Sequence, residues 1–362
     1  MPLDARIDAW ARLALAQVAP AAVAVLLREF GSPERIFQLS RAQIVAATSV
    51  ETAARIQTPV EGAVLDGTRR WLEEDGNELI AWDDADYPRA LLEVGEAPAV
   101  LFFVGRRELL NQPSLAIVGS RNATPQGMEN ARAFASALSH AGLTIVSGLA
   151  LGIDGAAHRG ALEGPGSTIA CIGTGPDRVY PASHRDLAHA IAAAGAIVSE
   201  FPPGTPPLRH NFPRRNRLIS ALARGVLVVE ATLASGSLIT ARLAGEQGRE
   251  VFAIPGSIHS PFSKGCHRLI RDGAKLVETA QDVLDELAVQ GLRPAPAVAT
   301  TGTPIVESHR AIVTALGGDP CDLDTLIGRT QLSAEALAAA LVELEIEGHI
   351  AALPGGRWQR VA

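Results

Sequence analysis

The spacing of hydrophobic residues over positions 1–75 is that of short amphipathic helices. Apolar side chains recur at intervals of three and four residues, as in Trp10 and Leu13. Ser32 and Pro33 follow a glycine and provide the N-cap and the first position of a new helix. We therefore predict a small helical module that packs against the rest of the chain or, alternatively, contacts DNA as a helix-hairpin does.

From residue 113 the pattern changes to short, continuously apolar runs separated by helical stretches. The runs are Leu115–Val118, Leu143–Val146, Thr168–Ile172, Ala196–Val198, Val226–Val229, Glu250–Ile254 and Ala274–Val277. Strands that are apolar throughout and joined through helices are typical of a parallel sheet covered on both faces. The sequence therefore predicts a Rossmann-like, doubly wound α/β domain over 76–290, in which 76–112 form a bridging extension.

The C-terminal part begins with a linker-like composition, since residues 291–304 are rich in Pro, Ala and Thr. Residues 305–362 then show three helical stretches and a short β-hairpin, the order of elements in a winged-helix domain. The third stretch, Ser333–His349, carries four glutamates and no lysine or arginine, so it would repel the groove of a DNA duplex. We interpret this unit as one that contacts protein.

Composition narrows the class of protein. Hydrophobic residues make up 47% of the chain and charged residues 20%, as in folded globular proteins. No apolar run reaches the length of a membrane span, and the N-terminus lacks the pattern of a secretion signal. The three cysteines are isolated and predict neither a disulfide framework nor a zinc site. We expect a cytoplasmic protein without a metal or other cofactor.

The charge is unevenly distributed. The whole chain has a net charge of −7, whereas residues 113–290 hold 16 basic and 14 acidic side chains, a net charge of +2. Within that segment, residues 201–229 contain five arginines and no acid. A concentrated basic patch on an acidic protein indicates one defined anionic partner.

Glycine and hydroxyl residues follow the predicted strands, where ligands of open α/β sheets bind. The candidates at this edge are Gly119, Ser120, Arg121, Ser147, Gly148, Ser235, Gly236 and Ser237. Glycine turns and helix N-termini can offer backbone N–H groups to phosphate. Neither a P-loop nor a dinucleotide fingerprint is present, which argues against an ATPase or a dinucleotide enzyme.

A second candidate site precedes the fifth run. It consists of Arg214, Arg215, Asn216 and Arg217. Guanidinium groups suit bidentate phosphate contacts, and they stack on bases. No acid lies nearby in the sequence to pair with these arginines, which favours a phosphate-binding groove over a solvated helix face. Tyr180 and Phe212 are the nearest aromatic candidates, but aromatic residues make up only 4% of the chain, so we expect stacking to be secondary.

Candidate catalysts have simpler explanations. Asp154 and His158 stand four residues apart, as a helix-capping acid and a packed histidine would. Glu200 and Glu230 end strands, where carboxylates commonly accept hydrogen bonds from loop amides, although they could also form a carboxylate pair. No Ser–His–Asp or metal-binding arrangement is evident. We therefore assign no catalytic residue and expect a protein that is not an enzyme.

The middle of the chain resembles the DNA-processing protein family DprA, also called Smf. The similarity extends over roughly 110–280. It rests on the stretches 118–127, 147–158, 180–181, 199–204, 212–219, 235–241, 248–252 and 255–256, which read VGSRNATPQG, SGLALGIDGAAH, YP, SEFPPG, FPRRNRLI, SGSLITA, GREVF and PG. The helical module, SAM-like or helix-hairpin-like, and the winged-helix tail resemble accessory domains found in many members.

The resemblance implies a bacterial, cytosolic mediator with a Rossmann-like core. Such proteins form homodimers, bind single-stranded DNA during natural transformation and help to load the RecA recombinase, without catalytic turnover. Their DNA-binding pocket would correspond here to Gly119–Arg121, the Ser147–Gly148 turn and the Arg214–Arg217 stretch.

Two alternatives remain open. One is a nucleotide-hydrolysing enzyme on a related Rossmann-like scaffold, although its Pro-Gly-Gly-x-Gly-Thr motif is absent from the comparable loop at Ser235–Thr240. The other is a regulator that binds duplex DNA through residues 305–362. Base release from nucleotides would favour the first, and tight duplex binding would favour the second.

Overall fold

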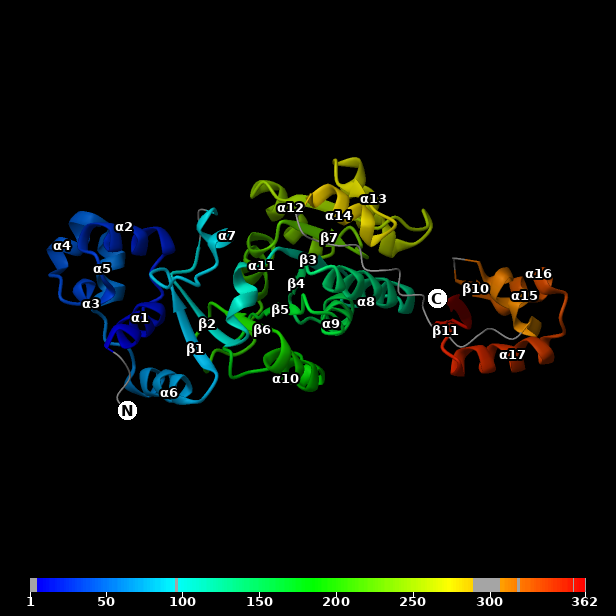
Figure 1. Cartoon of the computed structure of the whole chain (residues 1–362), viewed down its shortest axis with the longest axis horizontal. Helices are drawn as coiled ribbons and strands as arrows, with labels where there is room; N and C mark the ends of the chain where they lie inside the picture. The colour runs from blue at the N-terminus through cyan, green and yellow to red at the C-terminus, as the bar shows by residue number, and fades with distance from the viewer. Residues whose placement is uncertain (1–4, 95–96, 289–306, 318–319, 354, 362) are drawn as a thin grey trace.

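The computed structural model describes residues 5–94, 97–288, 307–317, 320–353 and 355–361. Figure 1 shows a helical unit at the N-terminal end, a central sheet flanked by helices, and a small unit at the C-terminal end. None of the helices in these ranges combines the length and the apolar character that a bilayer crossing requires.

The N-terminal unit consists of short helices, as predicted. They are α1 (Ala5–Leu15), α2 (Pro20–Phe30), α3 (Pro33–Ile36), α4 (Arg41–Ala47), α5 (Val50–Gln57) and α6 (Gly62–Glu73). The Ser32 hydroxyl accepts a hydrogen bond from the backbone N–H of Arg35, which confirms the predicted cap of α3. Trp10 and Trp71 pack in one cluster with Phe102, so this unit shares a hydrophobic core with the edge of the sheet.

The central sheet has nine strands in the order β1-β2-β6-β5-β4-β3-β7-β8-β9. Seven are the predicted ones: β3 (Ser114–Val118), β4 (Thr144–Ser147), β5 (Thr168–Cys171), β6 (Ala196–Ser199), β7 (Gly225–Val228), β8 (Glu250–Ala253) and β9 (Lys275–Leu276). Each pairs in parallel with its neighbours among the seven. The predicted α/β fold is confirmed.

The bridging segment extends this sheet. β1 (Asn77–Ala81) and β2 (Val100–Gly105) pair antiparallel with each other, and β2 pairs antiparallel with β6. Between them lies α7 (Arg89–Leu92), and η1 (Arg107–Asn111) leads into β3. The sequence predicted a bridging extension over 76–112, but it did not predict that this extension would add two strands to the sheet.

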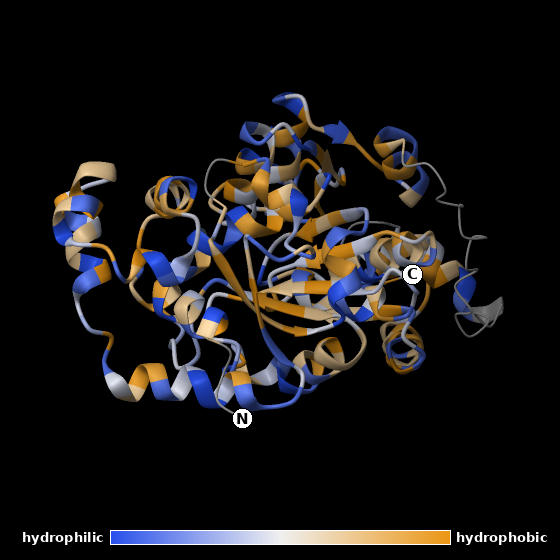
Figure 2. Ribbon diagram, turned by 60° about the vertical axis from the view of Figure 1, so that its left-hand side comes forward, coloured by the Kyte–Doolittle hydropathy of each residue, from blue (hydrophilic) through white to orange (hydrophobic). Residues whose placement is uncertain are grey.

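Helices cover both faces of the sheet, whose strands are the hydrophobic centre of Figure 2. One face packs against α11 (Asn211–Leu222), α12 (Ser237–Glu246) and α13 (Lys264–Arg271). The other packs against α8 (Pro125–His140), α9 (Ile153–Ala161) and α14 (Ala280–Leu287), with α10 (Arg185–Ala194) beside them. The short turns η2 (Ala182–His184) and η3 (Pro261–Ser263) precede α10 and α13.

The order of strands reverses once. From β3 the chain builds outward through β4, β5 and β6, and it then returns through α11 to place β7, β8 and β9 on the other side of β3. The loops that follow β3 and β7 therefore diverge to opposite faces. Such a switch point leaves a crevice at the carboxyl ends of the two strands.

The C-terminal unit has the predicted winged-helix elements. They are α15 (Glu307–Leu316), α16 (Leu323–Thr330), α17 (Ala334–Ile346) and the hairpin β11 (Ile350–Leu353) with β12 (Arg357–Arg360), to which β10 (Cys321–Asp322) adds a third strand. The unit has its own hydrophobic cluster. The predicted linker 291–304 lies outside the described residues. We propose the domain division 1–75, 76–290 and 305–362.

Candidate nucleic-acid interface

The crevice at the switch point is a cleft of about 460 Å³. The loop after β3, the loop after β7 and the first turns of α11 meet in it. Its lining includes Gly119, Ser120, Arg121, Asn122, Asp154, Arg215, Asn216, Thr232, Ser235, Gly236, Ser237 and Phe262. Eight of the predicted site residues thus lie together, although they are separated by more than a hundred positions along the chain.

The loop after β3 is fixed by Glu230, which follows β7. The backbone N–H of Ser120 donates to the Glu230 carbonyl at 2.8 Å. The Glu230 carboxylate accepts from the backbone N–H of Thr124 at 2.9 Å and from its hydroxyl at 2.6 Å, and burial raises the pKa of this carboxyl. The prediction that a strand-end acid binds loop amides is confirmed here. A Cβ at Gly119 would overlap the Ile153 side chain, so only glycine fits.

Arg121 is exposed at the mouth of the cleft. Its guanidinium lies over the Phe212 ring, 5.5 Å from the centroid. The Tyr180 ring, which is 48% exposed, lies 5.5 Å from the Phe212 ring. The two predicted aromatic candidates therefore sit beside the predicted phosphate ligand, an arrangement that suits an unpaired nucleotide.

The loop after β4 is hydrogen-bonded within the protein, so the prediction that its Ser147–Gly148 turn binds phosphate needs correction. The Ser147 side chain is fully buried, and its hydroxyl donates to the Ile117 carbonyl within the sheet. The backbone N–H groups of Gly148 and Ala150 both donate to the Asp154 carboxylate, at 3.1 and 3.4 Å. These amides already have partners, so the Ser147–Gly148 turn does not present them to a phosphate.

Two histidines hold the next residue of that loop, Leu149, which has a left-handed φ of 58°. Its N–H donates to Nε2 of His158, and its carbonyl accepts from Nδ1 of His184. Because Nε2 of His158 is an acceptor, the ring proton is on Nδ1, which donates to the Thr168 hydroxyl at 2.7 Å. Burial lowers the pKa of His158 to about 3, so the ring is neutral.

These contacts decide the interpretation of Asp154 and His158. The N-cap of α9 is Gly152, and Asp154 lies inside the first turn, so the predicted capping role is wrong. The predicted packing role is confirmed, because both side chains are buried and hold the loop after β4. Burial raises the pKa of Asp154, and the charge of Arg215 opposes that rise.

Arg215 is the buried cation of the site. Its side chain, only 3% exposed, donates through Nη1 to the carbonyls of Gly148 and Cys171. Burial lowers its pKa, and the nearby Asp154 carboxylate counters that effect. Nε of Arg215 has no hydrogen-bond partner among the described residues, although the side chain lines the cleft. A Cβ at Gly148 would overlap this guanidinium.

Arg214 and Arg217 do have an acidic partner, contrary to the prediction from the local sequence. Both pair with Glu200, which follows β6 and whose side chain is 2% exposed, and Nε of Arg214 lies 2.8 Å from a Glu200 oxygen. The acid comes from the end of another strand, so it was invisible in the sequence near the arginines. Glu200 thus binds Arg214 and Arg217, whereas Glu230 binds Thr124.

The far wall of the cleft is the start of α12. The hydroxyl groups of Ser235 and Ser237 lie 2.7 Å apart, and Gly236 is the N-cap residue of the helix. A Cβ at Gly236 would have no atom of the described residues within 4 Å, so it would meet open space. Asn216, half-buried on α11, lines the opposite side. This wall combines hydroxyl groups with a positive helix end.

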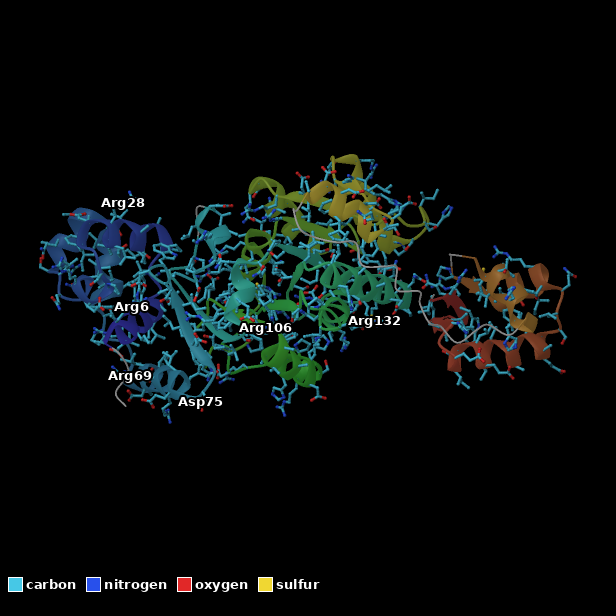
Figure 3. The ribbon with its side chains drawn as sticks, in the orientation of Figure 1. Arg6, Arg28, Arg69, Asp75, Arg106 and Arg132 are labelled. Carbon is cyan, nitrogen blue, oxygen red and sulfur yellow. The ribbon has the colours of Figure 1, made fainter. Side chains whose placement is uncertain are left out.

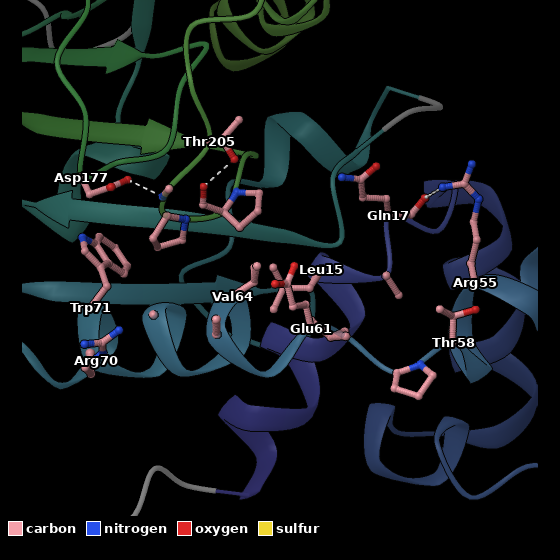
Figure 4. A pocket seen from close by; sticks show the side chains of 18 of the residues that line it. Leu15, Gln17, Arg55, Thr58, Glu61, Val64, Arg70, Trp71, Asp177 and Thr205 are labelled. Carbon is pink, nitrogen blue, oxygen red and sulfur yellow. Dashed lines mark hydrogen bonds between the residues drawn. The ribbon is translucent and has the colours of Figure 1, made fainter.

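A larger cleft, of about 1120 Å³, lies between the N-terminal helices and the loops after β5 and β6 (Figure 4). Its charges are mixed, since Arg55 is already bound to Glu51 and to the Gln17 carbonyl. Its further acidic residues are Glu61, Glu74 and Asp177. This mixture of charges does not favour binding of a polyanion. The smaller cleft at the switch point is therefore the better candidate for a nucleic-acid site.

The fold and the cleft define a doubly wound α/β protein with a polar, arginine-lined cleft at its switch point. The family model described as DNA recombination-mediator protein A matches residues 78–288, and that of the DprA winged helix domain matches 293–356. The chain belongs to the DNA recombination-mediator protein A family, as its resemblance to DprA and Smf indicated.

Comparisons with individual proteins lead to the same family. Protein Smf of Escherichia coli is 43% identical over 79% of this chain and 78% of its own length. A crystal structure of DNA processing protein A from Streptococcus pneumoniae is 39% identical, with a TM-score of 0.67 over 76% of this chain and 95% of that one. A structure of the Helicobacter pylori protein, reported for its single-stranded DNA binding mode, is 31% identical, with a TM-score of 0.53 over 58% of this chain and 96% of that one.

Proposed function

We propose that this chain binds single-stranded DNA in the cleft at the switch point and passes it to the RecA recombinase during natural transformation. The observation that carries the proposal is that Arg121 and the buried Arg215 line one cleft, with glycine, hydroxyl groups and a helix N-terminus opposite them. These are the groups that bind phosphate in other α/β folds. The reported single-stranded DNA binding of the related H. pylori protein supports it.

A single strand fits the cleft better than a duplex. The aromatic pair Tyr180 and Phe212 adjoins Arg121, and only unpaired bases can stack on such rings. The acidic helix α17 occupies the place that winged-helix proteins use for duplex DNA, and it would repel the phosphates there. The phosphate ligands in this proposal are Arg121 and Arg215, with Asn216 and Ser235–Ser237 as neutral donors.

The proposal is tested by fluorescence anisotropy with one labelled oligonucleotide of about 30 nucleotides, single-stranded and then annealed to its complement. We expect tighter binding of the single strand, with log K falling by about 0.7 per neutralised phosphate per decade of salt. Equal or tighter binding of the duplex would contradict the proposal, as would no binding at low salt.

We further propose that the protein acts by binding, without catalytic turnover, and as a homodimer. The acid–base candidates Asp154 and His158 are occupied in holding the loop after β4, which supports the first part. Incubation with nucleotides should release no base, and base release would revive the enzyme alternative. In a filament assembly assay, the protein should accelerate RecA loading on single-stranded DNA, and an unchanged rate would overturn the mediator role.

A further inference from the structure

The helix α17 is apolar on its exposed side as well as on its buried side. Its buried face consists of Leu337, Leu341 and Leu344, which pack in the core of the winged-helix unit. On the exposed side, Val342 is 51% and Ile346 is 81% exposed. A helix on the surface of a folded domain ordinarily presents polar residues to water, and a helix that is apolar all round is covered on every side. The exposed side of α17 therefore indicates a contact that the described part of this chain does not make.

The exposed apolar residues form one line along the helix. At about 100° per residue, Val342 and Ile346 lie about 40° apart around the helix axis, and the exposed Ala338 and Ala339 lie on the same side one turn earlier. Leu332, 37% exposed, adds an apolar side chain just before the helix begins. Because alanine side chains are short, a second helix can approach α17 closely along this line.

Carboxylates border this apolar line on both sides. Glu343 lies on one side of Val342 and Glu345 on the other, and both glutamates are exposed. Glu343 lies 3.4 Å from Nε2 of His309, and Glu345 accepts a hydrogen bond from the N–H of Ala352 at 3.2 Å. The helix carries no lysine or arginine. We call this surface the α17 face, and it consists of Ala338, Ala339, Val342, Glu343, Glu345 and Ile346.

The charges of the α17 face decide which class of partner fits it. When a helix-turn-helix unit binds duplex DNA, its recognition helix lies in the major groove among phosphates, which attract basic residues and repel Glu343 and Glu345. A protein helix that has a row of apolar side chains with lysine or arginine on either side complements both the apolar line and its carboxylate borders. Opposite charges beside an apolar seam also set the choice of partner between packed helices.

We propose that the α17 face is the docking site for a basic amphipathic helix of a partner protein. The apolar side chains of that helix pack along Val342 and Ile346, and its lysine or arginine side chains pair with Glu343 and Glu345. In Figure 1, α17 runs along the lower side of the C-terminal unit, away from the helices that cover the sheet. The helix has 13 residues, so the contact is small, and we expect it to be reversible and weakened by salt. The proposal does not depend on what binds in the cleft at the switch point.

The test measures binding of the full-length protein to a fluorescein-labelled peptide of about 20 residues, long enough to form a helix, with leucines at every third and fourth position and lysines between them. A second peptide has glutamate in place of each lysine. Fluorescence anisotropy should show tighter binding of the lysine peptide. Val342→Gln with Ile346→Gln should weaken that binding roughly tenfold or more, because two apolar side chains are then no longer removed from water.

A second pair of substitutions tests the carboxylates. Glu343→Gln with Glu345→Gln removes both charges, while the amide oxygen at position 345 can still accept from the N–H of Ala352. This variant should bind the lysine peptide more weakly than the wild type, and its affinity should depend less on salt. Equal affinities of the wild type for the lysine and glutamate peptides would overturn the proposal.

The matched control is Val50→Gln with Leu92→Gln. These two apolar residues are 58% and 55% exposed, and each is followed by a glutamate. The control should bind the lysine peptide as the wild type does. If it loses as much affinity as Val342→Gln with Ile346→Gln, the peptide adsorbs to exposed apolar residues in general, and the proposal is overturned.

Two further measurements identify other occupants of the α17 face. Val342→Gln with Ile346→Gln should leave sedimentation velocity and the affinity for duplex DNA as in the wild type. Altered self-association would mean that a second copy covers the face, and weaker duplex binding would mean that nucleic acid does, so either result overturns the proposal. If the double variant fails to fold, Ile346→Gln alone should weaken peptide binding in the same direction.

Discussion

Two glycine-containing turns lie at the same edge of the sheet, after β3 and after β4, and they have different roles. The first carries Arg121 into the cleft and leaves it exposed, with Phe212 as its neighbour. In the second, the N–H groups of Gly148, Leu149 and Ala150 already donate to buried side chains. A glycine turn shows that something approaches the backbone closely, but the partner can be a ligand or the protein itself.

Arg215 connects the two turns, because it holds the second one and lines the cleft formed by the first. Replacing Arg215 should therefore have the largest effect on stability and on DNA binding. Arg215→Met leaves the carbonyls of Gly148 and Cys171 without their donor, and each such loss costs about 1–3 kcal/mol. We expect a loss of about 3 kcal/mol in the free energy of unfolding, measured with urea, together with weaker binding of single-stranded DNA.

The matched control is Arg121→Met, the same substitution on an exposed side chain of the first turn. Its free energy of unfolding should stay within about 0.5 kcal/mol of the wild type. If Arg215→Met were as stable as Arg121→Met, the second turn would not depend on the buried guanidinium, and the comparison would fail.

Alanine at the glycines is the next strongest test. A Cβ at Gly148 would overlap the Arg215 guanidinium, whereas one at Gly236 would meet open space. Gly148→Ala should lower the free energy of unfolding by about 2 kcal/mol, in the range of overpacked cores, and Gly236→Ala should leave it nearly unchanged. Equal stabilities in urea unfolding would show that the second turn can move away from Arg215.

The carboxylate of Glu200 provides a sharper test of which arginines are available to DNA. Glu200→Gln removes the charge that pairs with Arg214 and Arg217, and we expect the free energy of unfolding to fall by about 2 kcal/mol. Both guanidinium groups then lose the negative charge of this carboxylate and lie on the same helix as Arg215, so affinity for single-stranded DNA should rise and its salt dependence should steepen. An unchanged affinity would mean that the DNA does not approach this part of α11.

The smallest predicted effect on stability comes from the protonation of His158. Its pKa falls from 6.5 to about 3 in the folded protein, so between these pH values the unfolded chain binds more protons and stability decreases as pH is lowered. From pH 7 to 5.5 we expect a loss of about 1 kcal/mol attributable to this residue. His158→Gln keeps an acceptor for Leu149 without titrating, so its stability should be less sensitive to pH over that interval. Parallel curves for the two proteins would contradict the neutral-histidine assignment.

The sheet could be predicted because its strands are buried on both faces and read as apolar runs, and because their carboxyl ends must meet at one edge. That reasoning placed Arg121 and Ser235 at one edge of the sheet, whereas the family resemblance alone added the stretch that contains Asn216; all three line the same cleft. β1 and β10 could not be predicted, since Asn77 opens one strand with polar residues and the other is two residues long.

The errors in the predicted site have one physical cause. Whether a polar group is available to a ligand depends on partners from distant strands, and a local pattern does not contain them. Glu200 comes from the end of β6 to pair with Arg214 and Arg217, and Asp154 folds back on the amides of its own loop. The arginines looked unpaired only because the search for acids was local.

The central claim is that the first turn, and not the second, binds the phosphates of single-stranded DNA. It is tested most directly by the salt dependence of single-strand affinity for the wild type, Arg121→Met and Arg28→Met, the last being an exposed arginine on α2 distant from the cleft (Figure 3). We predict that Arg121→Met lowers the slope of log K against log salt by about 0.7, the value for one phosphate contact, while Arg28→Met leaves the slope unchanged. Equal slopes for all three proteins would contradict the account.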